Sequence, residues 1–158
     1  TVEYATPYSH QYAAAGPNTL VDGLYGGDEY RTGDWQGFYA TPMQATIDLG
    51  ESFDIKGMSL GCVQDIRPWI WLPESVDFLV SQDGVNFSLF NHVEHDVAED
   101  DYEKQVFRFK TNIKSEEIVS ARYVRVITKP RGLIPEWHLG AGFDRWTFVD
   151  EWSISFVK

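Results

Sequence analysis

The 158-residue sequence contains a single cysteine, Cys62. One thiol excludes an internal disulfide and any zinc site built from several cysteines. No apolar run is long enough to span a bilayer, and no signal peptide is recognisable. The chain begins at Thr1 without a methionine. We therefore expect a segment cut from a longer exported protein, in an extracellular, periplasmic or cell-surface location.

Positive charge is also scarce, with 13 Lys and Arg against 24 Asp and Glu and a formal net charge of −11. Such a charge repels phosphate backbones and anionic lipid headgroups, so nucleic acid and membranes are not expected partners. It suits a neutral ligand or a cation, and it is equally explained by solubility alone.

Helical periodicity is missing, because no segment has apolar residues at i, i+3, i+4 and i+7. Ala45, Ile47 and Leu49 instead alternate with polar residues up to Gly50, as in a half-buried strand. Similar signals predict strands over residues 45–49, 55–63, 76–81, 87–92, 107–110 and 123–129, and one that begins at Trp146. The turn at 82–84 predicts a hairpin. We expect one all-β domain, with residues 1–17 as an irregular lead-in and the acidic tract 94–103 as a solvated excursion.

Aromatic residues are abundant, at 15% of the chain with six Trp. A core of this size does not need them all, so some should lie at the surface, where aromatics usually serve recognition. The loop 130–145 holds the pair Trp137-His138 and is too long and too apolar for a plain linker. The pair Asp150-Glu151 follows it and suggests a metal beside a binding surface.

Six stretches resemble discoidin-like domains, also called coagulation factor V/VIII type C domains. They are LVDG (20–23), ATIDLG (45–50), VDFLVSQDGVNF (76–87), ARYVRV (121–126), PEWHLGAG (135–142) and WTFVDEW (146–152). The likeness is closest to the version appended to Bacteroides-type β-hexosaminidases (chitobiase-like) and β-galactosidases, and many such domains are classed as family 32 carbohydrate-binding modules. It implies an eight-stranded jelly-roll β-sandwich of the galactose-binding-domain type, a structural calcium ion and often sugar binding at loops on one end.

The same resemblance implies a set of calcium ligands. Calcium takes six to eight oxygen ligands. The implied donors are the Leu20 carbonyl, Asp22, Asp28, Thr32, the Asp150 carbonyl and Glu151. The ion would pin the first loop to the last strand. A plain Asp-Gly turn with Glu151 in a surface ion pair is the alternative.

A sugar site needs an aromatic platform and a few polar groups that fix hydroxyl directions. The candidates are Asp65, Arg67, Trp69, Arg131, Trp137 and His138. Both source stretches, 64–71 and 130–145, should reach the same end of the sandwich. In galactose-binding relatives a histidine stands where this chain has Gln36, and an asparagine that they carry is missing from 64–71. Packing in the interior is the alternative role of Trp35, Trp69, Trp71 and Trp146. Capping of its own loop is the alternative role of His138.

Catalytic motifs are absent from the sequence. Glycoside hydrolysis needs two carboxylates that flank one bond, and adjacent strand residues such as Asp150 and Glu151 should point to opposite faces. No nucleophile elbow or phosphate-cradling glycine loop is present. We expect a non-catalytic accessory domain of an exported glycoside hydrolase, with glycans bearing galactose or N-acetylhexosamine as partners. The alternative is a structural module that packs a flat patch of Trp69, Trp71 and Trp137 on the catalytic domain of its own polypeptide.

Overall fold

Eight strands and four short 3-10 turns make up the protein, whose computed structural model describes all residues 1–158. The strands are β1 (Val2–Tyr4), β2 (Gln36–Tyr39), β3 (Gln44–Gln64), β4 (Ser75–Ser81), β5 (Ser88–Glu94), β6 (Gln105–Lys110), β7 (Val119–Lys129) and β8 (Trp146–Phe156). The turns are η1 (His10–Tyr12), η2 (Gly16–Val21), η3 (Tyr30–Thr32) and η4 (Ser115–Glu117). None of these turns has the length and hydrophobicity needed to cross a bilayer. The predicted all-β class with eight strands is confirmed.

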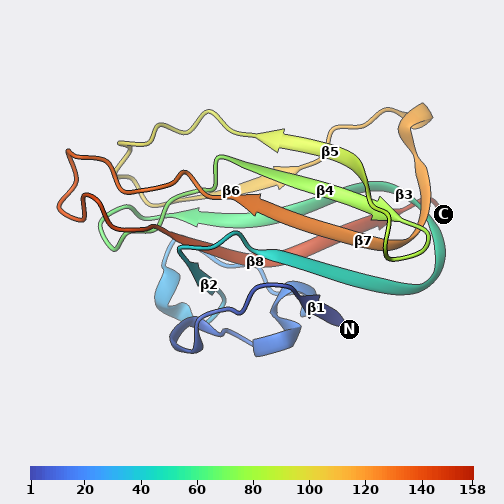
Figure 1. Ribbon diagram of the computed structural model, residues 1–158, viewed down its shortest axis with the longest axis horizontal. Helices are drawn as coiled ribbons and strands as arrows, with labels where there is room; N and C mark the ends of the chain where they lie inside the picture. The colour runs from blue at the N-terminus through green and yellow to red at the C-terminus, as the bar shows by residue number, and fades with distance from the viewer.

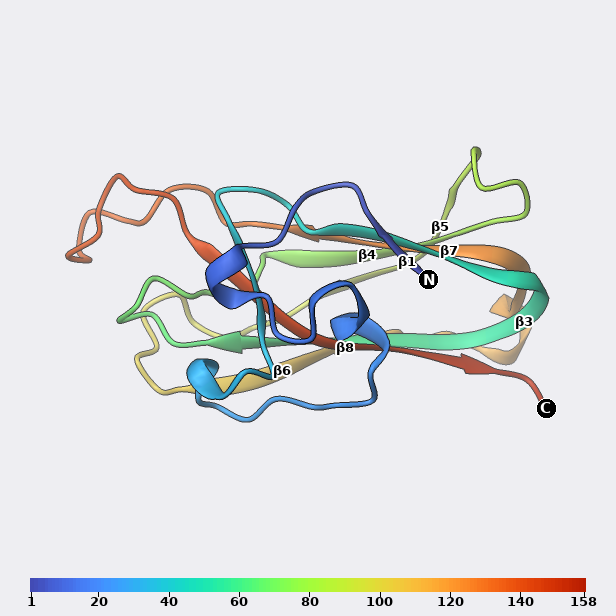
Figure 2. The same cartoon turned by 90° about the horizontal axis from the view of Figure 1, so that it is seen from below.

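Strand β3 belongs to both layers of the sandwich (Figures 1 and 2). Its first half pairs with β1 and β7, and its second half pairs with β6 and β8, all antiparallel. The register with β7 shifts between Asp48 and Phe53, where Gly50 takes a φ of 88°. The predicted break at Gly50 is therefore wrong as a strand end, because the chain bends there and continues into the second layer.

The core lies between the layers β1-β3-β7-β4-β5 and β2-β8-β3-β6. Twenty buried residues form one apolar cluster, with Phe78, Val126, Leu60, Phe109 and Trp152 among them. Side chains of a strand alternate between its faces, so the period of two along β4 and β7 marks the positions that meet in this core.

The N-terminal segment is more ordered than an irregular lead-in. Strand β1 adds to the edge of β3, with Val2 opposite Ile47, and the Ser9 amide donates to the carbonyl of Gly37 at 2.8 Å. The Tyr4 ring stacks with Phe38 of β2 at a centroid distance of 6.4 Å. The predicted absence of regular structure over 1–17 is wrong at β1, whose three residues were too few for a periodic signal.

Three long connections leave the same end of the sandwich, where β3, β5 and β7 finish (Figure 1). They are residues 65–74, 95–104 and 130–145. Strands β5, β7 and the second half of β3 run in the same direction, so the loops that follow them meet at one end, where side chains from distant parts of the chain can combine.

Candidate functional site

The two stretches expected to meet at the loop end do so through backbone hydrogen bonds. The Trp146 amide donates to the Trp69 carbonyl at 2.9 Å, and the Trp71 amide donates to the Trp146 carbonyl at 3.2 Å. The loop 130–145 also closes on itself, since the Ile134 amide donates to the Phe143 carbonyl at 2.8 Å. The predicted common end for 64–71 and 130–145 is confirmed, and the loop has a defined shape.

His138 holds the loop in place. Its Nδ1 accepts a hydrogen bond from the Gly140 amide at 2.9 Å, so Nε2 carries the proton and donates to the Ile66 carbonyl at 2.7 Å. The side chain is only 6% exposed. The sequence left two roles open for His138, contact with a sugar or capping of its own loop. Both ring nitrogens bond backbone groups, which supports the capping role.

Next to His138 the surface is hollowed over a volume of about 350 Å³, lined by Arg67, Tyr102, Trp137, His138 and Leu139. We call this the Trp137 hollow. The Trp137 side chain is 48% exposed, and its ring stands edge-on to Tyr102 with centroids 6.2 Å apart. The Arg67 guanidinium lies 4.9 Å from the Tyr102 ring centre and donates to the Tyr102 carbonyl at 3.2 Å. The hollow thus combines exposed ring faces with a positioned cation.

Trp69 packs within the loop end. Its ring stacks on Phe143 at 5.3 Å, and a Cβ added to Gly140 would lie 2.6 Å from the indole, so only glycine fits there. The backbone of Trp69 takes a φ of 73°, which is strained for a residue with a side chain. Trp71 is 1% exposed. A flat patch of Trp69, Trp71 and Trp137 is therefore wrong, because Trp71 lies in the interior.

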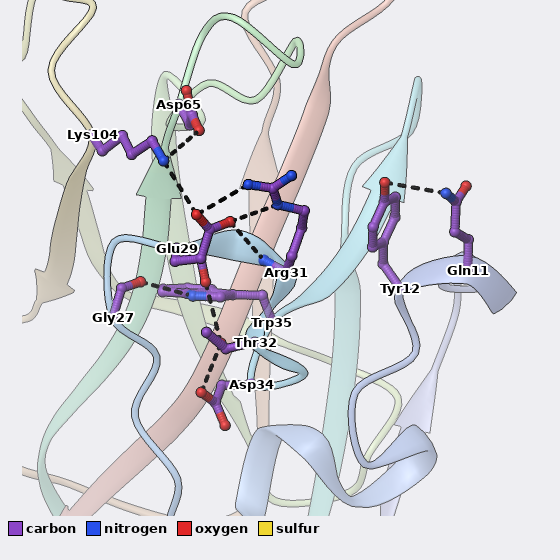
Figure 3. A network of polar contacts seen from close by, with 10 residues as sticks. All are labelled: Gln11, Tyr12, Gly27, Glu29, Arg31, Thr32, Asp34, Trp35, Asp65 and Lys104. Atoms are coloured by element: carbon purple, nitrogen blue, oxygen red, sulfur yellow. Dashed lines mark hydrogen bonds and ion pairs between the residues drawn. The ribbon is translucent and has the colours of Figure 1, made fainter.

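Asp65 and Arg131 lie outside the Trp137 hollow. Asp65 is buried, its Oδ1 has no hydrogen-bond partner, and burial raises its pKa. Its Oδ2 is 3.9 Å from the ammonium of Lys104, which also pairs with Glu29 at 3.2 Å, as Figure 3 shows. Arg131 donates to the Val97 carbonyl at 3.3 Å. Both side chains connect loops of this end.

The acidic tract 94–103 is a solvated excursion as predicted, since none of its residues is buried, and it is also fastened to the loop end. It has no strand partner between β5 and β6, and side chains satisfy its carbonyls instead. Arg131 donates to the Val97 carbonyl, Trp71 to the Glu99 carbonyl and Arg67 to the Tyr102 carbonyl. The Gln64 amide donates to the carbonyls of both Ala98 and Asp101. This arrangement places Tyr102 in the hollow. Tyr102 was missed from the sequence, although it is the one Trp, Tyr or Phe in the tract.

Asp150 and Glu151 both face the segment 23–26, against the expectation of opposite faces. Glu151 Oε2 accepts from the Gly23 amide and Asp150 Oδ2 from the Gly26 amide, each at 2.9 Å. The cause is a register shift between Leu60 and Cys62 of β3, opposite which β8 carries an extra residue. Asp150 is fully buried and also pairs with Arg108 at 2.9 Å.

The predicted calcium ligands are only partly gathered. Asp22 is close enough to Glu151 that its charge adds to the effect of burial in raising the Glu151 pKa. Leu20 lies in η2, two residues before Asp22. Thr32 instead donates to Asp34 at 2.9 Å, and Asp28 is exposed. No three acidic, His or Cys side chains converge on one point. Of the predicted ligand side chains, Asp22 and Glu151 lie close to each other, and those of Asp28 and Thr32 are directed elsewhere.

Solved structures provide the comparison with known proteins, since neither a protein-family model nor a curated sequence matches the chain. A fucolectin from striped bass (Morone saxatilis) serum aligns with a TM-score of 0.61 and 16% identity, over 100% of this chain and 47% of that one. CpGH89CBM32-5 from Clostridium perfringens, in complex with GalNAc-β-1,3-galactose, aligns at 0.52 and 15%, over 99% and 94%. The C-terminal domain of a Bacteroides fragilis chitobiase aligns at 0.50 and 16%, over 99% and 93%.

These likenesses cover nearly all of the chain at low sequence identity, so they show the fold. A further structure with this fold, CBM32-3 from a family 31 glycoside hydrolase of C. perfringens, aligns with a TM-score of 0.54 and 13% identity, over 98% of this chain and 88% of that one. The chain therefore has the discoidin-like β-sandwich fold of family 32 carbohydrate-binding modules, as its sequence motifs predicted.

Proposed function

We propose that the protein is a non-catalytic carbohydrate-binding accessory domain of an exported glycoside hydrolase, and that it binds sugar in the Trp137 hollow. The observation that carries the proposal is the hollow itself, which combines a half-exposed indole, a second ring from Tyr102 and the Arg67 guanidinium at the loop end. A galactose or N-acetylhexosamine unit fits this chemistry, and the C. perfringens module with the same fold is bound to a disaccharide of this kind.

The chemistry of the hollow matches the two sides of a sugar ring. The apolar C–H face of the sugar packs on an aromatic ring. The N–H groups of Arg67 that do not bond the Tyr102 carbonyl donate to sugar hydroxyls and so fix the orientation of the ring. Only five residues line the hollow, so one sugar ring makes few contacts there. Affinity for a single unit should therefore be millimolar, which corresponds to about −4 kcal/mol.

Replacing Trp137 by alanine tests the proposal. The aromatic platform is lost, and we expect binding to weaken by about 2 kcal/mol, or ~30-fold, beyond detection for a millimolar ligand. Isothermal titration against a glycan panel measures this. Trp137→Phe keeps part of the platform and should retain weak binding. Wild-type affinity in the alanine variant for every sugar that binds would contradict a site in the hollow.

A structural calcium ion at Asp22 and Glu151 forms part of the same proposal. It would neutralise a buried carboxylate whose pKa is already raised by burial and by neighbouring negative charge. Its chemical contribution is to join the segment 20–23 to β8. The parent enzyme, of the chitobiase-like or β-galactosidase-like type, would use the module extracellularly, in the periplasm or at the cell surface.

Calcium should raise the melting temperature of the wild-type chain relative to a sample in EDTA. A ligand present at 100 times its dissociation constant adds about 2.7 kcal/mol of stability. Glu151→Gln should abolish the difference, and Glu74→Gln, at an exposed ion pair, should preserve it. Identical melting curves in calcium and EDTA for the wild type would rule out the ion.

A structural module that packs on its parent enzyme is the second candidate. Leu133, Leu139 and Phe143 of the loop 130–145 are exposed, which is more apolar surface than a sugar needs. The glycan panel separates the two functions. Absence of binding to every sugar, with Trp137 protected from solvent quenching only when the catalytic domain is attached, would favour the structural role.

A further inference from the structure

A second pocket lies on the outer face of the layer β2-β8-β3-β6, away from the loop end. Its volume is about 240 Å³, and residues of β3, β6 and β8 line it, together with Thr111 just beyond β6. Ser59 of β3 lies opposite both Ser153 of β8 and Lys110 of β6, and Gly57 lies opposite Ser155. We call this the Lys56 pocket. The sequence patterns did not single it out.

The pocket is positively charged in a protein of net charge −11. Lys56 and Lys110 line it, and no aspartate or glutamate does. The lysine ion pairs of the structure use Lys104 and Lys129, so neither Lys56 nor Lys110 is neutralised by a carboxylate partner. Exposed charges are screened within about 8–10 Å at physiological salt, so acidic residues beyond that distance contribute little to the potential in the pocket.

Hydroxyl groups supply further donors on the floor of the pocket. Ser59 is only 9% exposed, lines the pocket, and its hydroxyl has no protein hydrogen-bond partner. The Thr111 Oγ1 accepts from the Met58 amide at 2.9 Å, which leaves its proton free to donate. A Cβ on Gly57 would lie 3.3 Å from that oxygen, so glycine keeps the floor open. The Ser59 Oγ is reached by solvent, so an oxyanion that enters the pocket can replace water as the acceptor of its proton.

We propose that the Lys56 pocket is an anion subsite that accepts the sulfate or carboxylate group of an acidic saccharide. Ammonium and hydroxyl donors without a competing carboxylate are the donors that such an oxyanion requires. The volume is below the ~300–1,000 Å³ of pockets that enclose a whole ligand, so one charged group enters. The choice of a saccharide as the carrier rests on the proposed function. The anion chemistry of the pocket does not.

The subsite is separate from the Trp137 hollow. Gly57 stands near the start of the second half of β3 and Arg67 follows its end, a distance of about 25 Å at ~3.3 Å per strand residue. A single sugar unit cannot reach both places. A chain of several rings with one acidic unit could occupy both, which would raise its affinity through effective concentration.

Chemical-shift titration of the backbone amides tests the subsite. The probes are galactose 6-sulfate, galacturonic acid, neutral galactose and sodium sulfate. We expect saturable shifts at Gly57 and Ser59 with both acidic sugars, weakening as salt rises, and no shift there with galactose. The double variant Lys56→Gln/Lys110→Gln should weaken acidic-sugar binding by about 10-fold or more. The matched control Arg122→Gln/Lys129→Gln removes two cations from the other layer and should change it by less than about 2-fold.

The outcomes separate this subsite from the proposed function. Acidic-sugar shifts that persist in Trp137→Ala support an independent subsite, even if neutral sugars bind nowhere. The subsite would be overturned if the amides of Gly57 and Ser59 showed no chemical-shift change, or if the double lysine variant bound acidic sugars as the wild type does. Either result would leave the proposal for the Trp137 hollow standing. Equal affinity for sodium sulfate and galactose 6-sulfate would show an inorganic anion site and overturn the saccharide as its ligand.

Discussion

Replacing Trp71 by alanine is expected to lower the free energy of unfolding by about 4 kcal/mol. The side chain is 1% exposed and packs with Ile66 and Ile134 in a small cluster under the loop end. Its indole N–H donates to the Glu99 carbonyl at 2.8 Å, and the Arg145 guanidinium lies 4.6 Å from its ring centre. Truncation therefore leaves a cavity, an unpaired carbonyl and a displaced cation. Urea denaturation followed by circular dichroism measures the loss.

Two further variants identify the cause of that loss. Trp71→Phe keeps most of the volume and removes the donor, so we expect a smaller loss of about 1–2 kcal/mol. Trp137→Ala removes the same side chain from an exposed position and should change stability by less than about 1 kcal/mol. A Trp71→Ala variant as stable as Trp137→Ala would mean that the loop end contributes little to the fold, and that Trp71 is not part of its core.

The strand positions were predictable because burial on one face leaves a period of two in the sequence. The alternation along 76–81 and 123–129 coincides with β4 and β7, and Trp146 begins β8 as expected. The continuity of β3 was not predictable. Whether Gly50 ends a strand or bends it depends on which strands pair on either side, and pairing partners are remote in sequence. The same holds for the bulge that turns Asp150 and Glu151 toward one loop.

The candidate sugar site was predictable in its location and less so in its members. Arg67 and Trp137 do line one hollow. Asp65 and Arg131 have the right side-chain chemistry, but they are directed into the contacts that hold the loops together. A sequence does not distinguish a polar residue that meets a ligand from one that meets a backbone carbonyl. Tyr102 was missed because the acidic residues around it predicted a loop that only contacts solvent.

Arg108→Met is expected to lower the free energy of unfolding by about 2–3 kcal/mol. Breaking a buried ion pair costs ~3–5 kcal/mol, and a discount applies because the Arg108 side chain is 29% exposed while Asp150 is fully buried. Methionine keeps the apolar stem of Arg108, whose guanidinium stacks over Tyr25 at 4.6 Å. Chemical denaturation in EDTA measures the effect without interference from a metal ion.

The matched control is Arg122→Met. Arg122 makes an equally short ion pair with Asp48 at 2.8 Å, but both side chains are more than 40% exposed, and we expect little change in stability. If the loss in Arg108→Met arises from a stranded buried charge, adding Asp150→Asn should recover part of it, since the amide needs no counter-ion. Equal effects of the two arginine variants would mean that Asp150 is hydrated in solution. The bulge of β8 would then not hold this carboxylate in the interior, and the Gly26 amide would lose its contact with the last strand, while Gly23 would stay bonded to Glu151.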